Sequence, residues 1–183
     1  MKVNIPKVEA SRLLNCGMVV LVTAAYKDKT TITPCAWQMP LSKKPACLGI
    51  ALAKAHFSSE LIRKSEEFII NIPHWDLLDK VVFCGSHSGR DIDKFAESRL
   101  TLIKPLSLSK TPQIGECLGH LECTLLDIKE VGDHYLFLGE VICAQADDNY
   151  FVNKCWDTRN GSLIFHLGGR SFFKSSPFVE VGR

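Results

Sequence analysis

Short apolar stretches rich in β-branched residues recur along the chain and alternate with polar turns. By periodicity alone, stretches of this length fit a buried helix and a strand equally well. Here the flanking Gly and Pro residues and the β-branched content favour strands. We expect strands at residues 18–25, 46–52, 68–72, 121–131, 135–144 and 162–167. Residues 132–134, a short connection that contains Gly132, predict a hairpin between the fourth and fifth of these strands.

Three segments between the strands have helical patterns. Ser58 and Ser59 offer N-caps to a helix that continues over residues 60–67. Residues 76–84 carry apolar side chains at helical spacing, and residues 91–98 begin with acidic side chains that suit the positive end of a helix dipole. Strands with a few helices inserted among them predict a mainly β fold of the α+β class, namely a β-barrel with helical excursions. The strand–helix alternation of a parallel α/β fold is absent.

Composition and charge narrow the classes of protein further. The chain has 183 residues, of which 46% are hydrophobic and 23% charged, so we expect one globular domain over residues 1–183. Its 22 basic and 20 acidic residues give a net charge of +2, which argues against a nucleic-acid binder. The longest apolar stretch, residues 18–25, is shorter than the roughly 20 residues needed to cross a membrane. The N-terminal residues show no secretory signal, so we expect a cytoplasmic protein.

Cysteines and common enzyme motifs give mostly negative information. None of the eight cysteines forms a C-x-x-C pair of the kind found in zinc sites, and we expect no metal site. In a cytoplasmic protein such residues are reduced thiols that pack as small hydrophobic side chains; a disulfide framework is the alternative. The chain also lacks the glycine-rich motifs of dinucleotide-binding and P-loop folds, and the H-E-x-x-H and G-x-S-x-G motifs. The cysteines are residues 16, 35, 47, 84, 117, 123, 143 and 155.

One cluster of loop-like residues, 30–40, combines small side chains with Trp37. Small side chains would let a flat aromatic ligand lie close to the backbone. The alternative is an edge strand whose Trp37 fills the core, with Pro34 keeping the strand away from a central position.

Two further clusters are rich in hydrogen-bond donors, and each lies directly before or at the start of a predicted helix. Residues 54–60 combine hydroxyls with a nearby lysine, and the start of a helix is a ready site for an anion. Residues 85–95 contain glycines, serines and Arg90, whose planar guanidinium suits a phosphate. The alternatives are a simple helix cap for the first cluster and a solvated loop with internal ion pairs for the second. Together the two clusters indicate a phosphorylated ligand.

The order and spacing of these segments resemble the flavin reductase-like family, which has the FMN-binding split β-barrel fold, and within it flavoredoxin-type proteins. The resemblance extends over nearly the whole chain. The segments that carry it are Pro34–Trp37 with Pro40–Ser42, His56–Ile62, Phe68–Pro73, Cys84-Gly85 with Ser88–Phe95, Leu121–Cys123 and Leu138–Val141.

The resemblance implies FMN as the cofactor, and the flavin itself would carry the chemistry in place of catalytic side chains. It implies that Arg90 contacts the phosphate or ribityl chain and that Lys94 lies at the pyrimidine edge of the ring. The residues implied to line the ring are Thr33, Pro34, Cys35, Ala36 and Trp37. Those implied to hold the phosphate are His56, Phe57, Ser58 and Ser59, and those of the loop that closes over the cofactor are Ser88, Gly89, Arg90 and Lys94.

Three positions leave alternatives open. Thr31 stands where many members of this family carry Asn, so a cofactor contact there is in doubt. Arg170, after Gly168 and Gly169, either meets the phosphate of a nicotinamide dinucleotide or is a surface residue. His166 is a catalytic candidate that either faces the flavin or has a structural role.

The resemblance also implies the activity. The first hypothesis is a reductase that takes electrons from NAD(P)H through bound FMN to free flavin, a ferric complex or a redox protein. The second is a flavoredoxin-type electron carrier that does not itself oxidise NAD(P)H, and the third is a split barrel that binds a ligand other than flavin. Members of the family are usually homodimers with the flavin near the subunit interface, so we expect a homodimer.

Overall fold

The computed structural model describes residues 2–14, 17–177 and 179. Strands dominate it, and all paired strands run antiparallel. The strands are β1 Gly17–Met18, β2 Val20–Tyr26, β3 Lys29–Cys35, β4 Gln38–Lys43, β5 Ala46–Ala53, β6 Glu67–Ile72, β7 Leu102–Ile103, β8 Gln113–Ile114, β9 Gly119–Val131, β10 His134–Ala146, β11 Phe151–Val152, β12 Cys155–Trp156, β13 Ile164–Gly168 and β14 Ser171–Lys174. The helices are η1 Lys7–Leu13, α1 Phe57–Ser65, η2 Trp75–Leu77, α2 Leu78–Ser86 and α3 Lys94–Ser98.

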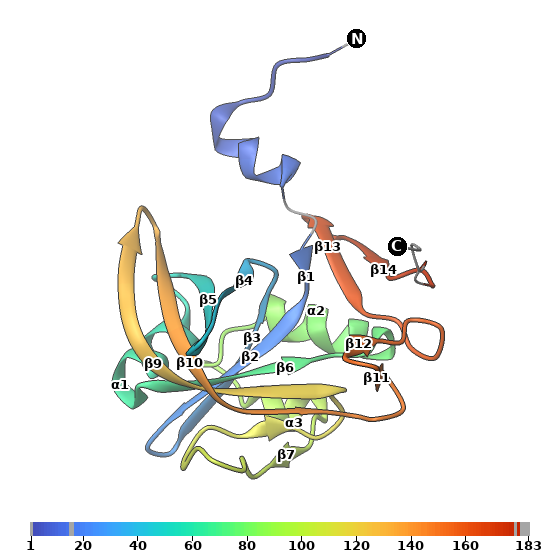
Figure 1. Ribbon diagram of the computed structural model, residues 1–183. Helices are drawn as coiled ribbons and strands as arrows, with labels where there is room; N and C mark the ends of the chain where they lie inside the picture. Colours follow the sequence, from blue (N-terminus) through green and yellow to red (C-terminus); the bar gives the residue numbers. More distant parts are fainter. Residues whose placement is uncertain (1, 15–16, 178, 180–183) are drawn as a thin grey trace.

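A seven-stranded sheet forms the body of the molecule, in the order β3-β2-β6-β9-β10-β5-β4 (Figure 1). The edge strands β3 and β4 follow each other in the chain, and only Ala36 and Trp37 separate them. The sheet must therefore curl until its two edges approach each other, although it does not close into a barrel. A second, three-stranded sheet of β1, β13 and β14 stands beside it. The prediction of a mainly β fold with inserted helices is confirmed, whereas a closed barrel is not observed.

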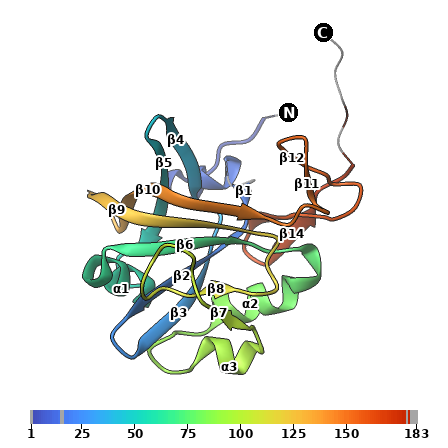
Figure 2. The ribbon, with the colours of Figure 1, turned by 60° about the horizontal axis from the view of Figure 1, so that its bottom comes forward.

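Helices α2 and α3 lie on one side of the large sheet, together with β7 and β8 (Figure 2), whereas Leu61 and Ile62 of α1 pack in the apolar cluster on the other face. Successive residues of β2 point to opposite faces of the sheet, and both faces are covered. Val20 and Val22 belong to one apolar cluster with Phe68, whereas Leu21 belongs to a second cluster with Val81 of α2. Burial on both faces explains why this strand is an uninterrupted apolar stretch in the sequence.

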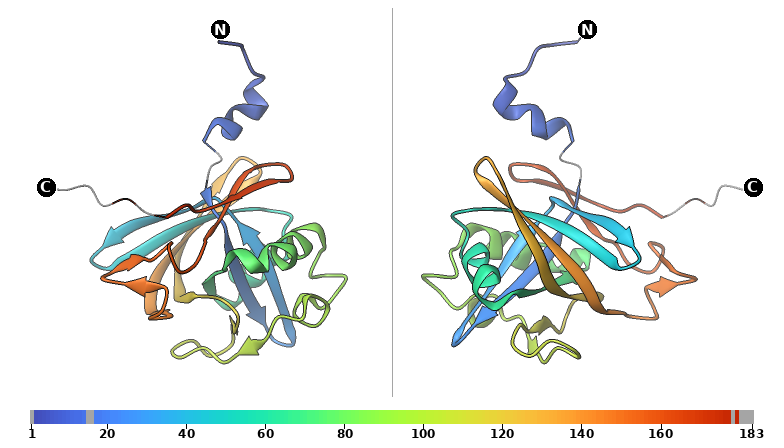
Figure 3. Two further views of the ribbon diagram at one scale, coloured as in Figure 1. Left: turned by 90° about the vertical axis from the view of Figure 1, so that its right-hand side faces the viewer. Right: turned by 60° about the vertical axis from the view of Figure 1, so that its left-hand side comes forward.

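The predicted hairpin is confirmed, since β9 and β10 pair over nearly their whole length. At its centre Gly139 lies so close to β6 that a Cβ atom there would come within 2.6 Å of the Phe68 ring. The hairpin is long and reaches beyond the rest of the sheet, whereas η1 projects away from the body with none of its residues buried (Figure 3). Among the described residues, no helix is both long and apolar enough to span a membrane.

The structure corrects the predicted starts of two helices. Helix α1 begins at Phe57, and its N-cap is His56 without a side-chain hydrogen bond, so Ser58 and Ser59 lie inside the helix and do not cap it. Helix α3 begins at Lys94, later than predicted, because the Asp93 carboxylate accepts hydrogen bonds from the first-turn N–H groups. Helix α2 ends two residues later than its predicted limit of 84.

Candidate functional site

The three polar clusters of the sequence meet at one place in the fold. The Thr33 hydroxyl on β3 donates a hydrogen bond of 2.9 Å to the Ser58 hydroxyl in α1. The loop after α2 presses on both elements at Gly89, where an added Cβ would lie 2.1 Å from Thr31 Oγ1 and 3.2 Å from the Phe57 ring. Only glycine allows this approach, so the loop, the edge strand and the helix start form one continuous surface.

Arg90 fastens the loop to the start of α1. Its guanidinium donates hydrogen bonds of 3.0 Å to the Ala55 carbonyl and 3.0 Å to the Glu60 carboxylate. It also lies over the Phe57 ring, 5.0 Å from the ring centroid. Hydrogen bonds from Lys64 and Arg90 hold the pKa of Glu60 below its usual value, so this carboxylate stays ionised. The guanidinium therefore lies near the positive end of the α1 dipole, and the Glu60 carboxylate offsets part of the positive potential there.

Ser58 and Ser59, expected to hold a phosphate, are both fully buried. The Ser59 hydroxyl donates its single hydrogen to the Ala53 carbonyl at 2.8 Å, and the Ser58 hydroxyl accepts a hydrogen bond from the Thr33 hydroxyl. In this structure both hydroxyls therefore fix the position of α1 against the strands. The Ser59 N–H donates to the His56 carbonyl at 3.1 Å, which leaves the N–H groups of Phe57 and Ser58 as the first-turn donors for an anion.

Lys94 is also buried, with 5% of its surface exposed. Its ammonium group donates hydrogen bonds to the carbonyls of Ile32 at 2.8 Å and Cys84 at 2.7 Å, and so bridges β3 and α2. Burial lowers the pKa of Lys94, although the nearby Cys84 acts in the opposite direction. No carboxylate of the described residues pairs with this ammonium group within the ion-pair distance. It therefore places a cation beneath the edge strand of the candidate site.

Trp37 does not fill the core, contrary to the structural alternative for its cluster. It is 44% exposed at the link between β3 and β4, and its ring lies 5.0 Å from that of His134 on β10. The other half of that alternative is confirmed, since β3 is an edge strand. A cavity of about 230 Å³ opens beside the indole. It is lined by Pro34, Cys35, Ala36, Trp37, Ala51, Leu52, Ala53, His56, His134 and His166.

Cys35 contributes a neutral thiol to the wall of this cavity. The thiol donates to the carbonyls of Trp37 and Ala51, and burial raises its pKa to about 11 despite these two contacts. His56 lines the same cavity, and burial together with the nearby His134 and Lys94 lowers the pKa of its imidazole, which is therefore neutral at pH 7. A neutral, partly aromatic cavity beside a cationic helix start suits a molecule with a flat ring and an anionic tail.

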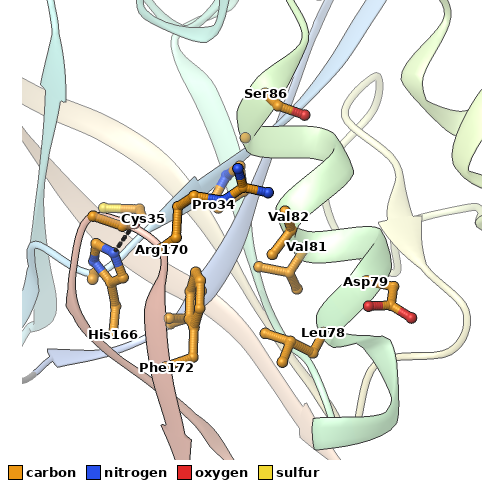
Figure 4. Close-up of a pocket in the computed structure, with 14 residues that line it drawn as sticks. Pro34, Cys35, Leu78, Asp79, Val81, Val82, Ser86, His166, Arg170 and Phe172 are labelled. Atoms are coloured by element: carbon orange, nitrogen blue, oxygen red, sulfur yellow. Dashed lines mark hydrogen bonds between the residues drawn. The ribbon is translucent and has the colours of Figure 1, made fainter.

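A larger cavity of about 770 Å³ lies on the other side of the β3 end, between α2 and the β13–β14 hairpin (Figure 4). The sequence singled out His166 and Arg170 separately, and the structure brings both to this cavity. His166 Nε2 lies 3.0 Å from the Gly169 carbonyl in the turn of the hairpin. The cavity residues of α2 were missed because their apolar pattern is that of any helix packed on a sheet.

The part of the site that the sequence could not show comes from distant strands. Ala51, Ala53 and His134 line the smaller cavity but belong to β5 and the β9–β10 hairpin, which carry no polar cluster. In the sequence His134 is one residue of a turn, and no local pattern connects it to Trp37.

Comparison with known proteins gives a consistent result. The model of the flavin reductase like domain matches residues 12–163. An uncharacterised protein of Archaeoglobus fulgidus is 35% identical over 150 residues, which cover 81% of this chain and 83% of that protein. Flavoredoxin from Methanosarcina acetivorans superimposes with a TM-score of 0.84 at 24% identity, covering 99% of this chain and 95% of that one. An FMN-binding domain of a flavin reductases-like enzyme from Shewanella baltica superimposes with a TM-score of 0.82 at 26% identity, covering 97% and 96%.

Proposed function

The chain belongs to the flavin reductase-like family, and from this premise we propose that it binds FMN and passes electrons from NAD(P)H to an acceptor. When bound, FMN would supply the hydride-accepting and electron-donating chemistry, so the protein need supply no nucleophile or strong base. Its own residues bind the cofactor, orient the ring and leave one face of it open to the second reactant. The observation that carries the proposal is the meeting of Thr33, Ser58 and Gly89 beside a cavity with an aromatic wall.

The donor groups present fit the phosphate of FMN. In the proposed arrangement the first turn of α1 supplies backbone N–H groups, and Arg90 supplies a guanidinium at the same place. In the proposed arrangement Ser59 holds the helix start in position through its hydroxyl, whereas the Ser58 hydroxyl, which accepts from Thr33, keeps its own hydrogen for the phosphate. Ser88 completes the loop, since its hydroxyl accepts a hydrogen bond of 3.2 Å from the Arg90 backbone N–H.

The smaller cavity fits the flavin ring. Ala36 lies between β3 and β4 and takes part in neither ladder, so its backbone can meet the polar edge of a ring. Trp37 and Pro34 line the same cavity and offer flat apolar surfaces to a ring. Lys94, buried beneath the strand, would stabilise negative charge on the reduced ring through its field rather than through direct contact.

The proposal is tested by titrating the purified protein with FMN and with riboflavin, followed by flavin absorbance and fluorescence. We expect FMN to bind more tightly, because riboflavin lacks the phosphate. Arg90→Ala should weaken FMN binding about tenfold, the loss expected for one hydrogen bond to a charged group, and should change riboflavin binding little. Arg63→Ala, which removes a guanidinium from the other end of α1, is the matched control. Equal losses for both ligands would remove the phosphate assignment.

Anaerobic mixing of the FMN-loaded protein with NADH or NADPH separates a reductase from a carrier. Bleaching of the flavin band within seconds supports the reductase and shows which nucleotide is the donor. An unchanged band over minutes would instead support the electron carrier. Reoxidation by free flavin, a ferric complex or a redox protein then identifies the acceptor class.

We further propose that the protein acts as a homodimer in the cytoplasm. Met39 and Leu41 on β4 are each nearly half exposed close to the candidate site, and exposed apolar side chains that lie together favour a protein contact. Every cysteine that the structure describes is a free thiol, in keeping with a reducing compartment; Cys16 lies outside the described residues. Light scattering of the purified protein would measure the mass of the assembly.

A further inference from the structure

The two cavities share a wall, although they open on different sides of the β3 end. Pro34, Cys35, Ala36 and His166 line both of them. A flavin ring held in the smaller cavity would therefore lie next to whatever molecule occupies the larger one. The larger cavity, at about 770 Å³, is within the usual size range of pockets for small molecules and cofactors.

The lining of the larger cavity is mostly apolar and contains one cationic side chain of Arg or Lys type. Leu78, Val81 and Val82 of α2 form one wall, and Phe172 of β14 faces them from the hairpin (Figure 4). Arg170 extends from the hairpin toward Pro34 (Figure 4). Its guanidinium makes no hydrogen bond or ion pair with any residue of the described chain. Asp79, the one acidic residue that the described part of the chain contributes to the lining, forms no ion pair with it.

The turn that presents Arg170 has a fixed shape. Gly168 and Gly169 both have positive φ, at 116° and 58°, a conformation that glycine adopts without strain. The Gly169 carbonyl lies 3.0 Å from His166 Nε2, and the His166 ring packs 4.8 Å from that of Phe172. The backbone that carries the Arg170 side chain is therefore a well-defined turn and not a long loop.

We propose that the larger cavity binds the second substrate of the flavin reaction, a planar molecule that carries an anionic group, and that Arg170 binds this anion. This proposal rests on the proposed function for the electron transfer, which needs a flavin in the neighbouring cavity, whereas binding of the anion by Arg170 does not. The apolar wall of α2 and the Phe172 ring accept the planar part, and the guanidinium pairs with phosphate or carboxylate oxygens. Two sources carry this chemistry, namely the phosphates of a nicotinamide dinucleotide and the carboxylate of an aromatic electron acceptor.

The experiment compares Arg170→Ala and Arg170→Lys with Lys174→Ala, which removes the same charge from an exposed position on the same hairpin. One arm measures the anaerobic reduction of the FMN-loaded protein at increasing NADH and NADPH concentrations. The other measures reoxidation of the photoreduced protein by 4-nitrobenzoate and by uncharged nitrobenzene. We expect Arg170→Ala to raise the half-saturating concentration about tenfold in one arm, with Arg170→Lys retaining part of the affinity.

The arm that responds identifies the source of the anion. An effect on the dinucleotides assigns the cavity to the donor, and an effect on nitrobenzoate but not nitrobenzene assigns it to a carboxylate-bearing acceptor. If Arg170→Ala and Lys174→Ala behave alike in both arms, the proposal is wrong.

A calorimetric readout keeps this proposal distinct from the proposed function. Oxidised NADP⁺ and benzoate, which transfer no electrons, are titrated into the wild-type protein and Arg170→Ala with and without FMN. Loss of binding in the variant supports the cavity assignment even if the protein fails to bind FMN, an outcome that would overturn only the proposed function. Binding of both ligands that is unchanged by the substitution contradicts the cavity assignment.

Discussion

The hydroxyl of Thr33 donates a hydrogen bond of 2.9 Å to the hydroxyl of Ser58, which lies 25 residues further along the chain. Both side chains are buried, so the bond fixes the edge strand β3 against the first turn of α1. The candidate ring site and the candidate phosphate site are thereby held at a constant separation. A cofactor that spans both sites gains from this preorganisation, because less motion has to be lost on binding.

Thr33→Val should test this coupling. The substitution keeps the shape of the side chain but leaves the Ser58 hydroxyl without its donor, and we expect a loss of about 1 kcal/mol in the free energy of unfolding. FMN affinity should fall about fivefold and riboflavin affinity less, as measured by fluorescence titration. Thr30→Val on the same strand, where the side chain makes no hydrogen bond within the described chain, is the control. Equal losses for the two ligands would show that the bond does not position the phosphate site.

Lys94→Met should lower the reduction potential of bound FMN. The buried ammonium group supplies positive charge beneath β3, and reduction of the flavin adds negative charge above it. A decrease of about 30 mV corresponds to about 1.4 kcal/mol for a two-electron couple. Spectroelectrochemical titration measures it, with Lys80→Met as the control because Lys80 donates to Arg99 at the surface. An unchanged potential in a folded variant would place the charge too far from the flavin to matter.

Stability should decrease between pH 7 and pH 5. Burial lowers the pKa of His120, with Glu122 acting in the opposite direction, and its Nδ1 lies 2.9 Å from the Asn71 side-chain oxygen. The unfolded chain therefore binds a proton near pH 6.5 that the folded protein takes up only at lower pH. The stabilisation is present above pH 6.5 and is lost as the pH falls through the folded pKa.

The pKa of His56 is lowered too, which adds to the same slope. Urea denaturation at pH 7, 6 and 5 measures the effect, and His120→Gln should show a shallower slope than the wild type. His87→Gln, at an exposed position, should keep the wild-type slope. A slope that is the same in all three proteins would assign the pH dependence to other groups.

Alkylation of the cysteines should be selective. Burial raises the pKa of Cys35 to about 11 and that of Cys123 to about 12, whereas Cys155 is exposed. Because the thiolate is the reactive form, N-ethylmaleimide at pH 7.5 should modify Cys155 and spare the other two in the folded protein. Peptide mass spectrometry measures the extent of labelling, and the unfolded protein should label at all three. Rapid labelling of Cys35 in the folded state would mean that the wall of the cavity opens.

The expectations that depend on neighbouring residues in the chain agree well with the structure. The hairpin predicted at 121–131 and 135–144 is β9 and β10, each extended by a few residues. Strand β2 follows the apolar stretch at 18–25 closely. Side-chain pattern, turn glycines and β-branched content act locally, so the sequence carries this information directly.

The expectations that depend on packing between distant parts of the chain agree less well with the structure. Serines such as Ser58 and Ser59 are common helix caps. In the fold, however, the Ser58 hydroxyl bonds to Thr33 and the Ser59 hydroxyl bonds to the Ala53 carbonyl. A lysine is usually a surface residue, but Lys94 is buried, and its ammonium group donates hydrogen bonds to the carbonyls of Ile32 and Cys84. Local propensity gives no access to such partners, because they come from other elements.

The sequence alone predicted a strand-rich fold, three segments that carry hydrogen-bond donors or an aromatic side chain, and a resemblance to one family. Only the tertiary structure decided that these segments meet, that Trp37 faces outward and that Arg170 and His166 line one cavity with α2. The physical reason is that strand and turn preferences are set by neighbouring residues. The surroundings of a side chain are set by the elements that a curled sheet brings against it, and those elements are far apart in the chain.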